Sequence, residues 1–260
     1  MYVFIIKCSM VNFQGCVPYA VSKKHTKSPI KSVIATILFF VFLIGIFLCL
    51  VYFRKIEKCY EKQSFYVVYV EKNRRKIDVD NVELIKKLGG AGSVLFFKEE
   101  YYLIANVYLK ENDAKEIAEG LVSTFAEAGV IKLEHESISK KKALHIAQNL
   151  SVSKFFEKFY VFLGNLEDMQ MQYVVGSLAE SEFLTKMLKV KLDFESIVDE
   201  MENPDNEKIF DDIKTHAHMF LNYFQAFFDE FLKQSKKESM ICALKFNFVK
   251  LKVDLFDNLR

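Results

Sequence analysis

Residues 32–53 constrain this chain more than any other segment, because 22 consecutive residues there carry no charge. The run reads SVIATILFFVFLIGIFLCLVYF and is bounded by Lys31 and by Arg54-Lys55. A helix rises about 1.5 Å per residue and a bilayer core is about 30 Å thick, so the run can just span it. A signal peptide has a shorter apolar region and a small-residue cleavage site. The pattern therefore predicts an uncleaved transmembrane helix over residues 32–53, with the lipid bilayer as a partner.

The charges beside this run do not decide which side of the membrane each end occupies. The tail, residues 1–31, is too polar to span and holds lysines without any acid, and the linker, residues 54–62, also holds several lysine and arginine residues. The positive-inside rule counts lysine and arginine in such flanks and does not separate them. Charge alone leaves the topology open.

Composition and cysteine spacing exclude several classes of function. The formal net charge of +2 does not suggest a nucleic-acid partner. The five cysteines form no CxxC or Cys/His cluster, so no metal or other cofactor is expected. A Cys59–Cys242 disulfide is open if the large part of the chain lies outside the cell, but two free thiols are favoured.

Residues 63–136 carry the pattern of a small α+β domain. Strands are predicted at 64–71, 93–97, 101–109 and 130–135 from β-branched and aromatic residues. Asp78 or Asp80 can cap a first helix that Gly89-Gly90 ends, and Asp113 to Glu116 resembles a capping box for a second helix, which Gly129 ends. The order β-α-β-β-α-β is typical of a ferredoxin-like antiparallel sheet with both helices on one face and the other face open.

Alternation along the strands predicts which side chains occupy each face of this sheet. The helix-covered face should carry Val68, Val70, Leu103, Ala105 and Val107. The open face should carry Val67, Tyr69, Tyr102, Ile104, Asn106 and Tyr108.

This domain resembles the SPOR domain of bacterial cell-division and sporulation proteins. The similar segments are GGAGSVLFF from residue 89, YLIANVY from residue 102 and DAKEIAEGL from residue 113, within a resemblance that covers residues 63–136. The chain departs from the family pattern at three positions: Tyr69 replaces its glutamine, and Glu71 and Asn106 replace its glycines.

The resemblance implies binding of peptidoglycan glycan strands through the open sheet face. The candidate glycan-binding residues are Tyr69, Tyr102, Asn106 and Tyr108. The tyrosine rings can stack on sugars, while the hydroxyls and the Asn106 amide can form hydrogen bonds. The alternative is that these tyrosines cover the sheet against the next domain. The resemblance also places residues 1–31 in the cytoplasm and the domains after the membrane helix outside it.

Residues 137–260 predict an all-α helical bundle. Helical segments are expected at 139–150, 153–163, 166–201 and 207–234, with breaks near Gly164-Asn165 and at Gly176. Phe220, Phe224 and Phe228 belong to an apolar stripe that is expected in the core, although it could also contact a partner. Ile241, Leu244, Phe248, Leu251 and Leu255 form a second stripe.

Catalytic signals are almost absent. His216 and His218 diverge on a helix and cannot chelate one metal, and the glycines at 89–92 lead into a strand rather than a phosphate-binding helix. The sequence therefore predicts a non-enzymatic single-pass membrane protein of the bacterial cell envelope. It would bind peptidoglycan or a partner in cell division or sporulation, and would contact envelope or division proteins through its helical domain. Two alternatives remain: a membrane-tethered regulatory or sensor subunit, and a secretion- or pilus-type assembly component whose ferredoxin-like unit pairs with a copy of itself.

Overall fold

The apolar run is helical in the part that can be described. The computed structural model describes residues 34, 37–47, 59–201, 208–233 and 236–260, and the chain divides into two compact units after residue 50. In the first unit, the described residues are helical and their side chains are exposed.

No helix in the described ranges combines the length and the apolar character needed to cross a membrane. The prediction of a transmembrane helix over residues 32–53 is therefore wrong, and so is the single-pass localisation with cytoplasmic and extracytoplasmic parts that was built on it. The rest of the run, the tail 1–31 and residues 54–58 of the linker lie outside the described residues.

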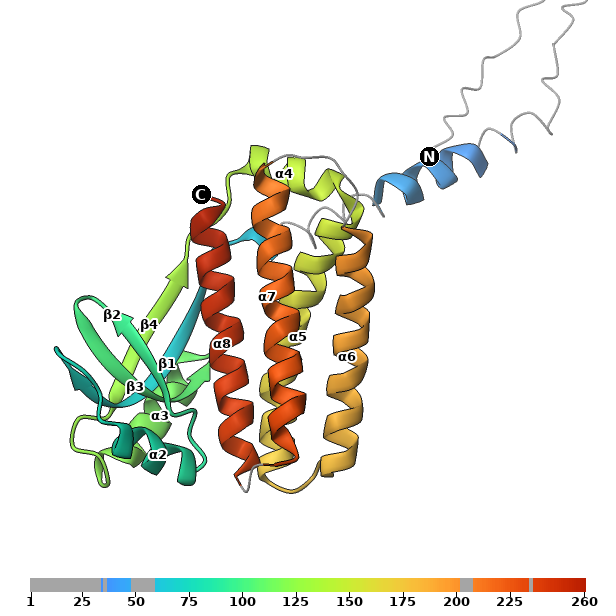
Figure 1. The fold of residues 1–260 in the computed structure, drawn as a ribbon. Helices are drawn as coiled ribbons and strands as arrows, with labels where there is room; N and C mark the ends of the chain where they lie inside the picture. The colour runs from blue at the N-terminus through green and yellow to red at the C-terminus, as the bar shows by residue number, and fades with distance from the viewer. Residues whose placement is uncertain (1–33, 35–36, 48–58, 202–207, 234–235) are drawn as a thin grey trace, which may run out of the picture. The chain divides into compact units, whose positions relative to one another are not determined.

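The second unit begins with a four-stranded antiparallel sheet and two helices (Figure 1). Their order is β-α-β-β-α-β, as the sequence predicted, and the strands lie side by side as β2-β3-β1-β4. The elements are β1 (Gln63–Asn73), α2 (Val79–Lys87), β2 (Ser93–Phe97), β3 (Glu100–Tyr108), α3 (Glu111–Val122) and β4 (Gly129–His135).

Local chemistry explains where most of these elements begin and end. The Asp78 carboxylate accepts a hydrogen bond from the Asp80 N–H and caps α2, as predicted. Lys98 and Glu99 both have positive φ, which joins β2 to β3 through a two-residue turn. The capping box at Asp113 is wrong, because α3 begins at Glu111 without a side-chain cap and ends before Gly129.

Each face of the sheet belongs to a different hydrophobic cluster. Val68, Val70, Leu103 and Ala105 pack with α2 and α3, as predicted. The opposite face, with Val67 and Ile104, packs into the core that it shares with the helices after the sheet. The expectation of an open sheet face is therefore wrong, because the helical part of the chain covers it.

Two register shifts change the face assignment along β3. Val68 pairs with Asn106 but Tyr69 pairs with Ile104, so Ala105 is an extra residue on β3. Beyond this bulge Val107 pairs with Val67 and joins the core shared with the bundle, whereas Tyr108 packs on the α2–α3 side. The prediction that Val107 faces α2 and α3 is wrong, because a one-residue insertion reverses the alternation that follows it.

The remaining elements form the helical bundle drawn on the right of Figure 1. They are α4 (Lys140–Gln148), α5 (Leu150–Val174), α6 (Glu180–Glu200), α7 (Lys208–Phe231) and α8 (Lys237–Asn258). α8 packs against β3 and β4 on one side and against α5 and α7 on the other, so it lies between the sheet and the rest of the bundle.

The two glycines that were expected to interrupt helices in the bundle, Gly164 and Gly176, have different effects on α5. Gly164 does not break α5, because buried residues on both sides of it, Leu163 and Leu166, fix this part of the helix in the core. Gly176 has a positive φ just beyond α5 and ends it, as predicted. Phe220 and Phe224 are fully buried, as predicted, whereas Phe228 of the same stripe is half-buried at the edge of the core.

Candidate functional site

The four residues proposed for glycan binding lie on β1 and β3, where other parts of the fold pack against them. The rings of Tyr69 and Tyr102 meet edge to face, 5.0 Å apart, and both pack against the core shared with the bundle. A Cβ on Gly129 would come within 2.7 Å of the Tyr69 hydroxyl, so this tyrosine fits closely over a glycine of β4. The Tyr102 hydroxyl donates to Glu100 at 2.9 Å.

Asn106 and Tyr108 lie at the other end of β3 and hydrogen-bond to each other, with 3.0 Å between the amide nitrogen and the phenol oxygen. Burial raises the pKa of the Tyr108 hydroxyl to about 12. The structure therefore brings these residues together in two pairs and covers the face on which they were expected. Glycan binding through them stays a prediction.

Asn106 and Tyr108 belong to a buried polar network centred on Lys245 of α8. The Lys245 ammonium lies 3.0 Å from the Gln170 carbonyl oxygen and 3.4 Å from a Glu167 carboxylate oxygen, and it faces the Tyr108 ring at 5.0 Å. Gln170 in turn donates to the Cys242 sulfur at 3.0 Å. Every member has a partner, so this network fastens β3, α5 and α8 together and offers no free group for chemistry.

A second lysine of α8, Lys252, is buried without a carboxylate within ion-pair distance among the described residues. Its ammonium lies 2.5 Å from the Gln63 side-chain oxygen and is surrounded by aromatic rings, which are those of Phe65, Phe159, Tyr160 and Phe256. Burial lowers the pKa of Lys252 to about 7.

His135 is the titratable neighbour of Lys252 on β4. It is fully buried, its ring centroid lies 3.8 Å from that of Phe256 with the two rings tilted by 34°, and its Nε2 has no hydrogen-bond partner in the described structure. Burial, and then the charge of Lys252, lower the pKa of His135 to about 4. Neither His135 nor Lys252 lines one of the described hollows. We therefore expect these two side chains to affect stability rather than ligand binding.

The most site-like hollow is a groove between α2 and α3, on the sheet face away from the bundle. Val70 and Leu103 of the sheet form its floor, and Leu84 and Ile85 of α2 and Phe125 after α3 form its walls. It consists of two adjoining hollows of about 380 and 180 Å³, which share Val70, Ile85 and Phe125. We call it the α2–α3 groove.

The two ends of the α2–α3 groove differ in chemistry. The outer end holds the carboxylates of Glu71 and Glu127, together with the Asn81 amide, which donates to Glu71 at 2.8 Å. Neither carboxylate forms an ion pair with a described residue. The inner end is apolar and reaches Gly89 and Cys242.

At the inner end, the groove contacts α8 through one thiol. The Cys242 thiol donates to the Gly89 carbonyl oxygen at 3.4 Å, and burial raises the pKa of this thiol to about 12. It therefore stays protonated and acts as a link rather than as a nucleophile. Cys59 and Cys242 are both buried and neither forms a disulfide, as the prediction of two thiols required.

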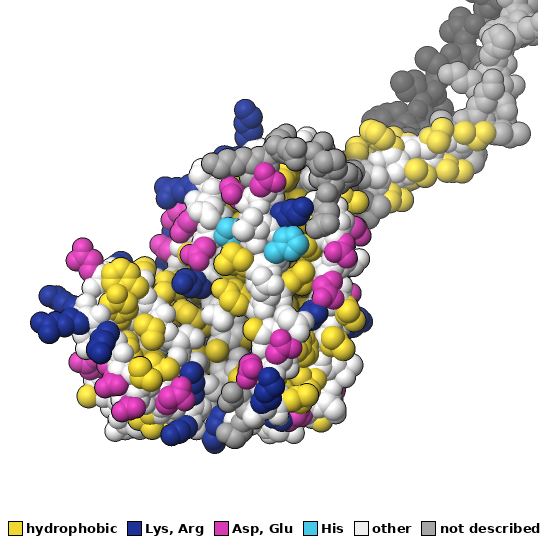
Figure 2. Space-filling view, viewed as in Figure 1, with side chains coloured by type: hydrophobic (Ala, Val, Ile, Leu, Met, Phe, Trp, Pro, Cys, Tyr) yellow, Lys and Arg dark blue, Asp and Glu magenta, His cyan; other side chains and the backbone are white. Residues whose placement is uncertain are grey.

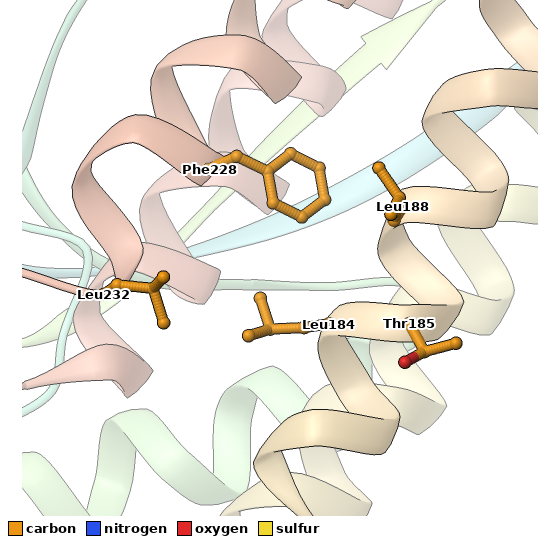
Figure 3. Close-up of a pocket in the computed structure, with 5 residues that line it drawn as sticks. All are labelled: Leu184, Thr185, Leu188, Phe228 and Leu232. Carbon is orange, nitrogen blue, oxygen red and sulfur yellow. The ribbon is translucent and has the colours of Figure 1, made fainter.

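A second hollow of about 230 Å³ lies between α6 and α7 (Figure 3). Leu184 and Leu188 of α6 point toward Phe228 and Leu232 across it. Its one hydroxyl, on Thr185, already donates to the Ser181 carbonyl oxygen at 2.7 Å. This hollow has no polar group left to orient a small ligand.

Sequence reasoning missed the α2–α3 groove because its residues come from five separate segments. Glu71 was noticed only as a departure from a family pattern, and the loop residue Glu127 was not singled out. The one available signal was the weak apolar face of α2, where only Ile85 is buried. The buried lysines were missed as well, although their spacing of seven places them on one side of α8.

A scan against protein-family models and searches of curated proteins and of solved structures find no match to this chain.

Proposed function

We propose that this protein is a non-enzymatic regulatory protein that binds a small cationic molecule with an apolar body in the α2–α3 groove. The observation that carries the proposal is the groove itself, in which an apolar floor ends at two carboxylates that have no ion-pair partner in the part of the chain that the structure describes. Small-molecule sites have this composition, with mostly apolar walls and a few convergent polar groups. This keeps the regulatory part of one alternative that the sequence raised.

The charge at the outer end favours an amine. Glu71 and Glu127 place two negative charges beside Val70 and Phe125, so an ammonium group can bind the carboxylates while its alkyl or aryl body covers the apolar floor. A neutral ligand would forgo the charge-assisted hydrogen bonds, and an anionic ligand would be repelled.

The inner end supports a regulatory role because it adjoins the bundle. Gly89 and Gly90 line the groove, and the Gly89 carbonyl oxygen accepts the Cys242 hydrogen bond from α8. Through Gln170, the same thiol is connected to Lys245. A ligand that reaches the inner end therefore contacts the residues that hold the sheet on α8.

Binding is tested on the full chain with 2-phenylethylamine as the probe and 2-phenylethanol as its neutral counterpart. Calorimetry should give a dissociation constant for the amine of about 1 mM or tighter, and weaker binding for the alcohol. Glu71→Gln should weaken amine binding about tenfold or more, because a hydrogen bond to a charged group is lost, and should leave alcohol binding unchanged.

A blocking variant and its control complete the test. Leu84→Trp should fill the groove and abolish amine binding, whereas Val79→Trp, on an exposed position of the same helix outside the groove, should bind normally. Amine binding should also slow hydrogen exchange in residues 237–245 of α8. Absence of amine binding, or equal binding by Leu84→Trp and wild type, would refute the proposal.

A further inference from the structure

The two edges of the sheet carry different chemistry. β4 presents Lys132 and Glu134, which form an ion pair, and Lys62, directly before β1, lies 3.3 Å from Glu134. β2 carries no charge from Ser93 to Phe97. Charged side chains on an edge strand discourage pairing with another strand, so β4 is protected and β2 is not.

β2 also exposes apolar side chains on one face. Val94 is 44% exposed and Phe96 is 59% exposed, and the Phe96 ring rests on Tyr101 with 4.8 Å between centroids. Among the described elements β2 packs extensively only against β3, and it is an outer strand of the sheet. Hydrophobic side chains gather over this side of the molecule in the space-filling view (Figure 2).

The backbone of the same two residues points away from the sheet. Phe97 and Glu100 flank the two-residue turn, so they form a hydrogen-bonded pair, and such pairs alternate along the ladder. Leu95 and Ser93 therefore bond to β3, whereas the N–H and C=O groups of Val94 and Phe96 face outward.

We propose that two copies of this chain pair through β2, edge to edge and antiparallel, about a twofold axis at Leu95. In this register, Val94 of each copy lies opposite Phe96 of the second copy, and the outward backbone groups of these residues form four hydrogen bonds. The two four-stranded sheets become one continuous sheet.

The strand itself argues for a second copy as the occupant. Because Val94 and Phe96 lie on the same face, the twofold pairing places apolar side chains opposite apolar side chains and builds one stripe across the axis. The first charges, on Lys98 and Glu99, lie in the turn beyond the paired residues. The same patch thus complements itself, as a twofold interface requires.

Cross-linking tests the register. Cys8, Cys16 and Cys49 are replaced by serine in every sample. Val94→Cys and Phe96→Cys copies are then mixed and oxidised mildly. Residues in a hydrogen-bonded pair lie about 5.5 Å apart at Cα, which a disulfide can bridge, whereas identical positions lie about 8 Å apart diagonally. The mixture should cross-link and each variant alone should not; a mixture that cross-links no more than the separate variants refutes the pairing.

Sedimentation of the full chain tests the association itself. Wild type should sediment as a dimer at about 100 μM, and Phe96→Lys should raise the dimer dissociation constant about tenfold or more without changing the melting temperature. Leu192→Lys, at a similarly exposed apolar position of α6, is the control and should leave the dimer intact. If wild type is monomeric, so that the edge is free or serves another peptide, or if both variants behave alike, the proposal fails.

Discussion

Replacing Lys252 by methionine should stabilise the protein at neutral pH. The side chain is 2% exposed, and its one described hydrogen-bond partner is Gln63. The surrounding aromatic rings attract a cation, but they do not replace the hydration that an ammonium loses on burial. Methionine has a similar length and no charge, so it can occupy the same space among these rings.

The magnitude follows from the pKa of Lys252, which burial lowers from 10.5 to about 7. This lowering of the pKa corresponds to about 5 kcal/mol of folding free energy that is lost when Lys252 is charged. Because the unfolded chain binds the proton below pH 10.5 and the folded chain only below pH 7, wild-type stability falls as the pH drops from 10.5 to 7. Loss of the hydrogen bond to Gln63 offsets about 1–3 kcal/mol. Lys252→Met should therefore gain about 2–4 kcal/mol at pH 6.5, and the gain should disappear as the pH approaches 10.5.

Urea unfolding of the full chain at pH 6.5, 8 and 9.5 measures this difference. Lys250→Met is the matched control, because Lys250 lies on the same helix and is exposed, and it should change stability little at any of these pH values. A Lys252→Met variant that is less stable than wild type at pH 6.5, or whose gain is the same at all three pH values, would show that the buried ammonium carries no such penalty.

Three further predictions concern other buried groups, and urea unfolding checks each of them. Lys245→Met should lower stability by about 3 kcal/mol at pH 7, because it leaves the half-buried Glu167 carboxylate without its cation; a neutral result would mean that the pair contributes nothing. The pKa of His135 is about 4, against 6.5 for free histidine, so wild-type stability should fall by about 3 kcal/mol between pH 6.5 and pH 4. His135→Phe should flatten this dependence, and an unchanged slope would assign it to other groups. Phe224→Asp should lower stability by about 4 kcal/mol or more, since the site is fully buried, and a variant that unfolds like wild type would place Phe224 at a surface.

The element order of the sheet could be predicted because its signals are local. Strand patterns, the Asp78 cap and the glycines near residue 90 act within a few residues, and they recur in the structure. The capping box at Asp113 failed because Glu111 and its neighbours already form the first turn of α3, so another residue occupies the cap position. Competing local signals of similar strength differ by about 1 kcal/mol, which packing can reverse.

The candidate site could not be predicted in the same way. The α2–α3 groove depends on how far α2 lies from α3, and that spacing is set by Ile85 and Phe125 on the sheet rather than by either helix sequence. Glu71 and Glu127 are 56 positions apart in the chain and meet only because β1 and the loop after α3 reach the same end of the groove.

By itself, the sequence determined the α+β class, the order of strands and helices, the buried phenylalanine stripe and the two free thiols, since each follows from short-range pattern or from side-chain type. Tertiary structure decided which faces are covered. The bulge at Ala105 reversed the side-chain alternation, and α8 closed over the face that was expected to be open. It also placed Lys245 and Lys252 in the interior, one with a carboxylate and one without. The sequence cannot distinguish these two lysines, because the free energy of burying a charge depends on neighbours that only the folded chain brings together.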